Sequence, residues 1–312
     1  MNIRRIKYMN ITAKDVQTLR ERTGCGMMDC KNALVETEGD MEKAVALLRE
    51  KGLAAAAKKS SRIAAEGTVC AVVGGGDGIL VEVNAETDFV TKSEQFQSLA
   101  ASIANLVFEK QPKDVDELLD MDMGGLTVGD AIRDKILTIG ENISVRRFVR
   151  LSGNVVSYIH GGGRIGVLVS FDADACVVQK DAFAEFAKDV AMQIAALSPL
   201  YVASEDVPED VIASEKEILI AQIRNDEKNA GKPESIIEKM VDGRIGKYYE
   251  TNCLLNQAFV KDGAVTVEKH AQNVSKELGG DIKIKCFVRY EKGEGIQKRE
   301  DNLADEVAKM IQ

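Results

Sequence analysis

The sequence VCAVVGGGDGILVEVN at residues 69–84 recurs without a gap as VVSYIHGGGRIGVLVS at residues 155–170. In each copy a run of apolar residues leads into a glycine cluster and a second apolar run follows it, which is the pattern of a β-hairpin. A constant offset between the two copies indicates an internal duplication. The chain is therefore expected to contain two related sheet-forming halves, residues 66–152 and 153–291.

Each copy leads into an amphipathic helix and ends in a further strand. Apolar residues recur at helical spacing after both hairpins, at Phe96, Leu99, Ile103 and Leu106, and again at Phe183, Phe186, Val190 and Ile194. The halves then end in ISVRRFVR at residues 143–150 and in IKIKCFVR at residues 282–289. This order of elements predicts an α+β fold, a duplicated core of two antiparallel sheets with helices on one face of each.

The glycine clusters resemble two kinds of functional loop, and the sequence disfavours both. The cluster at residues 74–78 is followed by a strand pattern, whereas a phosphate-binding loop needs a helix N-terminus behind it. His160 opens a Gly-Gly-Gly run like that of an esterase oxyanion loop, but the sequence has no Gly-x-Ser-x-Gly nucleophile motif. Both clusters are predicted to be hairpin turns, with His160 at a turn edge as a structural or partner-contacting residue.

The connection from the first hairpin to its helix reads AETDFVTK at residues 85–92. Phe89 has no position on either the strand or the helix pattern. A large apolar side chain next to Asp88 on such a loop suits a wedge that buries its ring in a partner protein. The alternative is a phenylalanine that folds back under its own helix, and spacing alone leaves both open.

Residues 10–53 are predicted to form a three-helix module. Thr12 and Asp40 are suitable N-caps, and Gly24, Gly39 and Gly52 mark helix ends. Because about forty residues give only a small core, the module suits a docking head better than a catalytic domain. Met27 and Met28 are adjacent, so either at least one of them serves a contact surface or both are partly buried.

The remaining segments have simpler patterns. Residues 54–65 are basic and predict a linker, for which a helical start is left open. Residues 207–250 predict an inserted, protruding antiparallel helical hairpin. Ile139 stands at a helix end before Gly140, either exposed for contact or buried in the last turn. Residues 292–312 predict a C-terminal module with a short helix from Asn302. The fold prediction leaves out the first eight residues, because a start of the protein at Met9 is also compatible with the helix that begins after Thr12.

Composition and residue counts disfavour several classes of function. A formal net charge of −9 argues against broad nucleic-acid binding. No apolar run is long enough to span a membrane and the N-terminus lacks a signal-peptide core, so we expect a cytoplasmic protein. The six cysteines form no Cys-x-x-Cys pair, which indicates neither a metal site nor a disulfide framework. With two histidines and no paired nucleophile and base, an enzyme is the least favoured class, and no cofactor is expected.

Several motifs together resemble the elongation factor Ts family, the bacterial nucleotide-exchange factors for elongation factor Tu. These motifs are LRERTG at residues 19–24, MMDCK at 27–31, TDFV at 87–90, IGENI at 139–143, and His160 with GRIGV at 163–167. The similarity extends from Met9 to Gln312, and the helical hairpin is similar to that of the long bacterial form.

The resemblance implies a function and a set of partner-binding residues. The chain would be a guanine-nucleotide exchange factor that binds elongation factor Tu and promotes release of GDP, with a UBA-like head and no covalent chemistry or bound nucleotide of its own. Asp88 and Phe89, flanked by Thr87 and Val90, would enter the GTPase domain near its magnesium and phosphate site. The other implied contacts are Arg20, Met27 and Met28 on the same domain, Ile139 and Gly140 near the wedge, and His160 toward another domain of the partner.

Two other hypotheses remain. The chain could be an adaptor whose head recognises a ubiquitin-like or chaperone client, or an enzyme that holds a nucleotide in its glycine turns. The sequence also leaves open a homodimer of the core.

Overall fold

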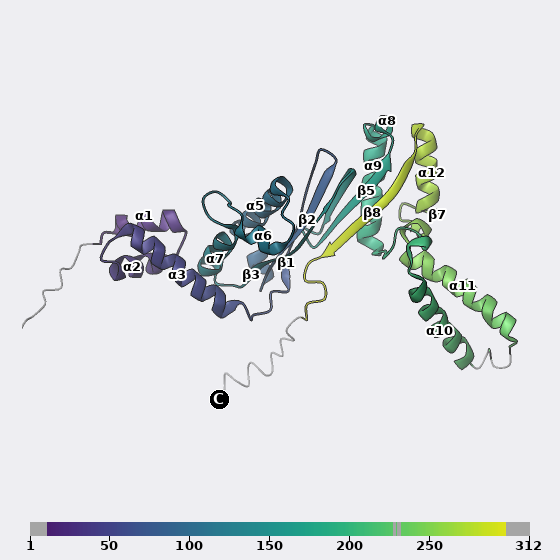
Figure 1. Ribbon diagram of the computed structural model, residues 1–312, viewed down its shortest axis with the longest axis horizontal. Helices are drawn as coiled ribbons and strands as arrows, with labels where there is room; N and C mark the ends of the chain where they lie inside the picture. Colours follow the sequence, from purple (N-terminus) through teal and green to yellow (C-terminus); the bar gives the residue numbers. More distant parts are fainter. Residues whose placement is uncertain (1–10, 227–228, 230–231, 298–312) are drawn as a thin grey trace, which may run out of the picture. The chain divides into compact units, whose positions relative to one another are not determined.

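The computed structural model describes residues 11–226, 229 and 232–297 (Figure 1). By packing, the described residues divide into two compact units: the first holds residues 11–70, 81–148 and 291–297, and the second holds the described residues of 71–80 and 149–290. The predicted boundaries follow the sequence repeat and the units follow packing. The head, most of the first core half and residues 291–297 therefore fall in one unit, whereas residues 71–80 and 149–152 of the first half fall in the other. The first eight residues and the predicted helix from Asn302 lie outside the described residues.

The N-terminal segment is helical, as predicted. Its helices are α1 (Ala13–Thr23), α2 (Met27–Glu36) and α3 (Met41–Lys59). Thr12 caps α1 in a capping box with Asp15, and Gly24 ends the helix in the left-handed conformation. A small core joins the three helices, formed by Val16, Leu19, Cys25, Cys30, Ala33, Leu34, Ala44 and Leu48.

Helix α3 is longer than the sequence pattern indicated. We expected it to end at Gly52 and a linker to follow, but it continues to Lys59 through a run of alanines, the residue with the highest helix propensity. Gly52 is buried and faces α7 (Val128–Ile139), where an added Cβ would lie 3.7 Å from the carbonyl oxygen of Arg133. The glycine therefore permits close packing of two helices within the first unit.

The first sheet has the strand order β1-β2-β3. Its strands are β1 (Glu66–Gly74), β2 (Asp77–Ala85) and β3 (Ile143–Leu151). Gly75 and Gly76 form the tight hairpin turn, both with positive φ. Helices follow the hairpin, namely α4 (Asp88–Thr91), α5 (Glu94–Lys110), α6 (Val115–Asp120) and α7. The predicted apolar face of α5 is buried.

The second sheet repeats this arrangement in the order β4-β5-β8. Strands β4 (Asn154–His160) and β5 (Ile165–Ala173) are antiparallel, with His160 opposite Ile165. The edge strand opposite β4 is β8 (Ile282–Glu291), and helices of this half include α8 (Ala175–Val178), α9 (Asp181–Leu197) and α12 (Val267–Leu278). The core gathers around Phe171, Phe183 and Phe186.

The two halves match beyond the hairpins. Helices α7 and α12 each begin after a threonine, Thr127 or Thr266, whose side chain accepts a hydrogen bond from the third helical N–H. Each ends at a left-handed glycine, Gly140 or Gly279, and a strand follows. The structure is thus a mixture of helices and antiparallel sheet, and the α+β prediction is confirmed.

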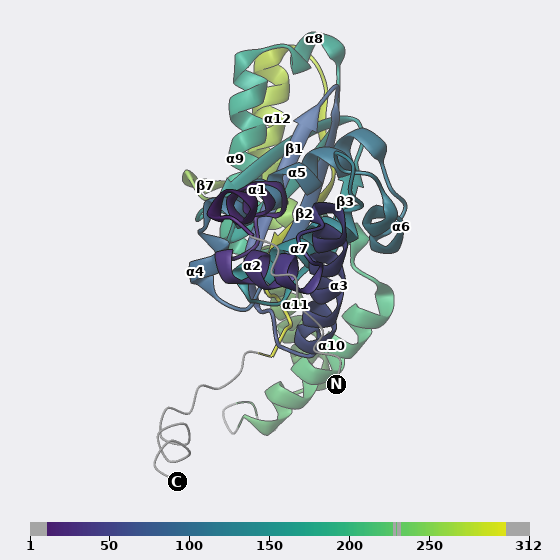
Figure 2. The same ribbon diagram turned by 90° about the vertical axis from the view of Figure 1, so that its left-hand side faces the viewer.

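The second half contains an insertion. Helices α10 (Glu209–Asn225) and α11 (Glu234–Asn252) lie side by side (Figure 1 and Figure 2). Their seam has its own apolar cluster of Leu219, Ile223, Ile237, Val241 and Ile245. Sequence patterns did not predict the short elements on either side, η1 (Ser204–Asp206), η3 (Leu254–Asn256), β6 (Ala258–Phe259) and β7 (Asp262–Thr266). The helices of the described ranges include none both long and apolar enough to cross a membrane.

Candidate protein-binding site

The loop at residues 85–92 is ordered by a one-turn helix. Strand β2 ends at Ala85 and α4 begins at Asp88. Thr87 has extended backbone angles and its hydroxyl accepts a hydrogen bond from the Val90 N–H at 3.4 Å, as an N-cap residue does. Thr91 is buried, so the helix turns one side inward and presents the other to solvent.

Phe89 projects from this helix. Its side chain is 84% exposed, the highest value among the exposed large hydrophobic residues of the described chain. The alternative in which the ring folds back under its own helix is therefore not the one that the structure adopts. Exposing a phenylalanine forgoes roughly 2 kcal/mol of burial free energy, which burial in a partner would recover.

A second loop braces the first one. The Thr87 backbone N–H and hydroxyl donate to the two carboxylate oxygens of Glu141 at 3.0 and 2.6 Å. In the opposite direction, the Asn142 N–H donates to Glu86 Oε1 at 2.6 Å. These three bonds hold the tip of the β2–α4 connection against the residues that follow α7.

The brace brings two groups of predicted residues together. Gly140 is exposed and ends α7 with a φ of 92°, a conformation that favours glycine. Ile139 is half-buried, between the two alternatives left open by the sequence. Both precede Glu141 in the chain, so the brace brings them to the Thr87 end of the loop.

Asp88 supplies a negative charge next to Phe89. Its carboxylate is paired with Lys92 Nζ at 2.7 Å and is about half exposed. The hydrogen bond from Lys92 lowers the pKa of Asp88 below its ordinary value, against a smaller opposing effect of desolvation. The loop therefore presents an apolar ring beside an ionised carboxylate.

Arg20, Met27 and Met28 line one groove, formed mainly by α1 and α2 of the head with Gln95 of α5 at its border. The groove has a volume of about 960 Å³. Met27 is 56% and Met28 62% exposed, so both side chains face solvent and neither fills the core. Unbranched thioether side chains adapt to different contact surfaces, which suits a docking patch.

His160 belongs to the second unit. It is exposed at the end of β4, and its Nδ1 lies 3.1 Å from the hydroxyl of Tyr158. Gly161, Gly162 and Gly163 follow with positive φ, which confirms a turn at this position.

Sequence reasoning identified the loop but missed the residues that brace it. Glu86, Glu141 and Asn142 make contacts across more than fifty residues of sequence, and no local pattern reports such pairing. The available signal was a polar pair directly after the helix-ending Gly140. Elsewhere in the described ranges, no group of three or more histidine, cysteine or carboxylate side chains is arranged to hold a metal ion.

Comparisons with known proteins cover nearly the whole chain. The family described as "Elongation factor TS" matches residues 86–294. An elongation factor Ts from Clostridium perfringens (strain SM101 / Type A) is 54% identical over 306 residues, which are 96% of this chain and 99% of the relative. One from Clostridium botulinum (strain Eklund 17B / Type B) is 51% identical over 307 residues, with 96% and 99% covered.

Proposed function

Since the chain belongs to the elongation factor Ts family and so acts in translation elongation, we propose that it is a guanine-nucleotide exchange factor for elongation factor Tu. It binds the GDP form of that GTPase in the cytoplasm and promotes release of GDP. The chain itself carries out no covalent chemistry in this process and binds no nucleotide.

The loop at residues 87–90 acts as a wedge. A GTPase holds its nucleotide through backbone donors, a lysine and a magnesium ion that bridges protein and phosphate oxygens. Insertion of the Phe89 ring beside these groups displaces the loop that carries them, and the Asp88 carboxylate competes for their donors or cations. The Glu141 brace supports this role, because a loop already fixed in place loses little conformational entropy on binding.

Thermodynamic linkage sets the binding free energy that the wedge must supply. If the factor binds nucleotide-free elongation factor Tu more tightly than the GDP form by some ratio, GDP affinity falls by the same ratio. A preference of about 5.5 kcal/mol would shift the ratio of nucleotide-free to GDP-bound elongation factor Tu from 1:99 to 99:1. GTP binding to the nucleotide-free partner in this complex then expels the factor by the same reciprocity.

The exposure of Phe89 is the single observation that supports the wedge most strongly. The test is stopped-flow release of fluorescent GDP from elongation factor Tu. Phe89→Ala should lower the maximal release rate at least about tenfold, the size of effect expected for an aromatic anchor. Leu200→Ala is the matched control, because Leu200 is also exposed, at 64%, and lies outside the loop. An unchanged rate with Phe89→Ala would exclude the wedge.

The methionines of the head have a different role in this proposal, namely docking. The double substitution Met27→Ala, Met28→Ala should raise the factor concentration needed for half-maximal release and leave the maximal rate nearly unchanged. If the double variant instead abolished all binding while Phe89→Ala had no effect, the adaptor hypothesis would be favoured. Equilibrium dialysis of the chain with GDP tests the enzyme hypothesis, which requires direct nucleotide binding.

A further inference from the structure

The groove lined by Arg20, Met27 and Met28, called the head groove below, is an apolar surface with a basic edge. The described part of the chain leaves both methionine side chains exposed. Arg20 and Lys31 are basic and exposed at the groove, and Glu21 is the one acidic side chain among its described lining residues. Such a groove suits an amphipathic helix that carries acidic residues beside its apolar stripe.

The C-terminal sequence of this chain contains a segment of that kind. It reads KREDNLADEVAKMIQ at residues 298–312, and Leu303, Val307 and Met310 recur at helical spacing. On a helix, Glu306 borders this stripe, because it is spaced by three or four residues from Leu303 and Met310. Residues 300–306 contain four carboxylates and no basic side chain. The segment therefore complements the head groove in both polarity and charge.

Hydrogen bonds hold the chain just before this segment against the first unit, which also contains the head groove. Lys292 Nζ donates to Glu66 Oε2 at 2.5 Å, and the Gly293 N–H donates to Glu82 Oε1 at 2.7 Å. Both carboxylates belong to strands of the first sheet, Glu66 to β1 and Glu82 to β2. The C-terminal segment therefore starts from a fixed point of this unit.

This fixed point lies near the wedge loop. The hydrogen bond from Lys92 is the main cause of the low pKa of Asp88, and the charge of Lys292 lowers that pKa further, so Lys292 lies within electrostatic range of Asp88. Gln95, seven residues after Asp88 in sequence, borders the head groove. When extended, residues 298–302 add up to roughly 17 Å of reach toward it.

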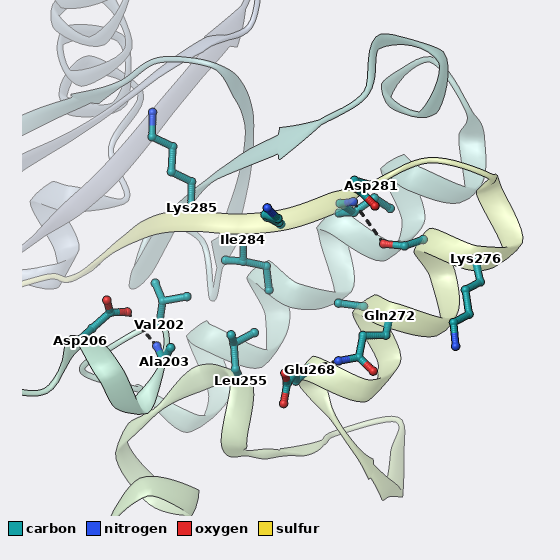
Figure 3. Close-up of a pocket in the computed structure, with 14 residues that line it drawn as sticks. Val202, Ala203, Asp206, Leu255, Glu268, Gln272, Lys276, Asp281, Ile284 and Lys285 are labelled. Atoms are coloured by element: carbon teal, nitrogen blue, oxygen red, sulfur yellow. Dashed lines mark hydrogen bonds between the residues drawn. The ribbon is translucent and has the colours of Figure 1, made fainter.

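Two alternative pairings of groove and segment fit the charges less well. The first ten residues contain three basic and no acidic side chains, so they would bring positive charge to the basic edge of the head groove. The groove of the second unit, shown in Figure 3, has Asp206, Glu268 and Asp281 among its lining residues. An acidic segment would meet like charges there.

We propose that residues 302–312 form an amphipathic helix that covers the head groove in the free chain. Its apolar stripe packs against Met27 and Met28, and its carboxylates face Arg20 and Lys31. Because the linker keeps the segment at an effective concentration on the order of millimolar, even a weak affinity covers the groove for much of the time. A partner that docks on the two methionines must displace this helix, a consequence that rests on the proposed function.

Oxidation by dilute hydrogen peroxide measures this cover in the full chain, with no partner present. Peroxide converts accessible methionine to the sulfoxide, and peptide mass spectrometry at low conversion gives the rates at Met27 and Met28. Val307→Asp places a charge in the apolar stripe, and its burial in the groove is unfavourable. It should raise both rates at least about threefold, which corresponds to a groove that is covered for about two-thirds of the time.

Ala308→Asp is the matched control, because it introduces the same charge one residue further on, outside the apolar stripe. It should leave the rates at Met27 and Met28 within about 1.5-fold of the wild-type values. Met121, half-buried at the end of α6, is an internal reference whose rate should stay constant in both variants. A rise at Met121 as well would identify a loss of fold.

Lys31→Glu tests the same contact from the side of the groove. It places a negative charge opposite the acidic segment, and the oxidation rate at Met28 should rise about twofold. The proposal is overturned if Val307→Asp and Lys31→Glu leave the rates unchanged, or if Ala308→Asp raises them as much as Val307→Asp. These measurements need no nucleotide exchange, so a failure here is distinguishable from a failure of the wedge.

Discussion

Glu82 is a charged residue with no exposed surface in the middle of the first sheet. Its carboxylate accepts hydrogen bonds from Arg147 Nε at 2.7 Å, Arg146 Nη1 at 3.1 Å and the Gly293 N–H at 2.7 Å. Burial alone would raise the pKa of Glu82, but the bonds from Gly293, Arg147 and Arg146 together hold it below the ordinary value of 4.5. The cluster joins β2, β3 and the segment that follows β8 within the first unit.

This cluster makes stability depend on pH. Because the pKa of Glu82 is lower in the folded chain than in the unfolded chain, its contribution is fully present above about pH 5 and is lost as the pH falls through the folded-state value. Glu82→Gln should lower the free energy of unfolding at pH 7 by about 3 kcal/mol, since it removes the buried charge that Arg146 and Arg147 share. Near pH 3 the difference between wild type and variant should shrink. Urea unfolding at both pH values tests this, and a difference that does not vary with pH would contradict it.

At the scale of elements, the turn after β8 depends on one glycine. Gly293 has a φ of 68°, and an added Cβ would overlap the carbonyl oxygen of Ala65. Gly295 has a similar φ of 74°, but no atom lies within 4 Å of its added Cβ. A residue with a side chain would therefore have similar backbone strain at either position, but only at position 293 would its Cβ meet another atom.

Alanine substitutions separate these two effects. Gly295→Ala should cost about 1 kcal/mol of unfolding free energy, the penalty of a left-handed residue with a side chain. Gly293→Ala should cost about 3 kcal/mol, because overpacking adds to the same strain. Chemical denaturation measures both values. Equal costs would show that the close contact with Ala65 relaxes without penalty.

The sequence predicted those elements whose signals are local. The repeated hairpins, the apolar face of α5 and the caps of α1 and α7 follow from residue spacing and from glycine or threonine at fixed positions. The true end of α3 did not follow, because packing against α7 overrides the breaking tendency of Gly52. Strands β6 and β7 are too short for a periodic pattern, at two and five residues.

The candidate site was predictable to a similar extent. The position of Phe89 outside both patterns identified the loop, whereas its exposure required the structure. The brace from Glu141 could not be predicted, since Thr87 lies 54 residues away in sequence. Whether Arg20, Ile139 and His160 contact a partner stays a prediction.

At the scale of the whole molecule, the inserted hairpin is a self-contained part of the second unit. Its apolar cluster is separate from the cluster around Phe171. Backbone hydrogen bonds join the segments that precede and follow the hairpin. The Leu200 N–H donates to the Asn252 carbonyl at 2.8 Å, and the Leu254 N–H donates to the Tyr201 carbonyl at 2.9 Å. We therefore expect the sheet and helices of the second unit to keep their packing without α10 and α11.

Excision of the hairpin tests this independence. Replacing residues 209–249 with a short glycine-serine linker should leave one cooperative unfolding transition, with a midpoint within a few degrees of the wild-type value. Differential scanning calorimetry measures the midpoint and the cooperativity. A broad transition, or an unfolded chain, would show that the hairpin supports the core.

The wedge itself is tested most directly by where residue 89 goes in the complex. With the photoreactive analogue p-benzoylphenylalanine in place of Phe89, irradiation of the full chain with GDP-bound elongation factor Tu should yield one cross-linked product. Mass spectrometry should locate that link in the GTPase domain, beside the residues that hold magnesium and phosphate. Efficient cross-linking to any other domain, or none at a concentration where the two proteins bind and exchange proceeds, would contradict the account.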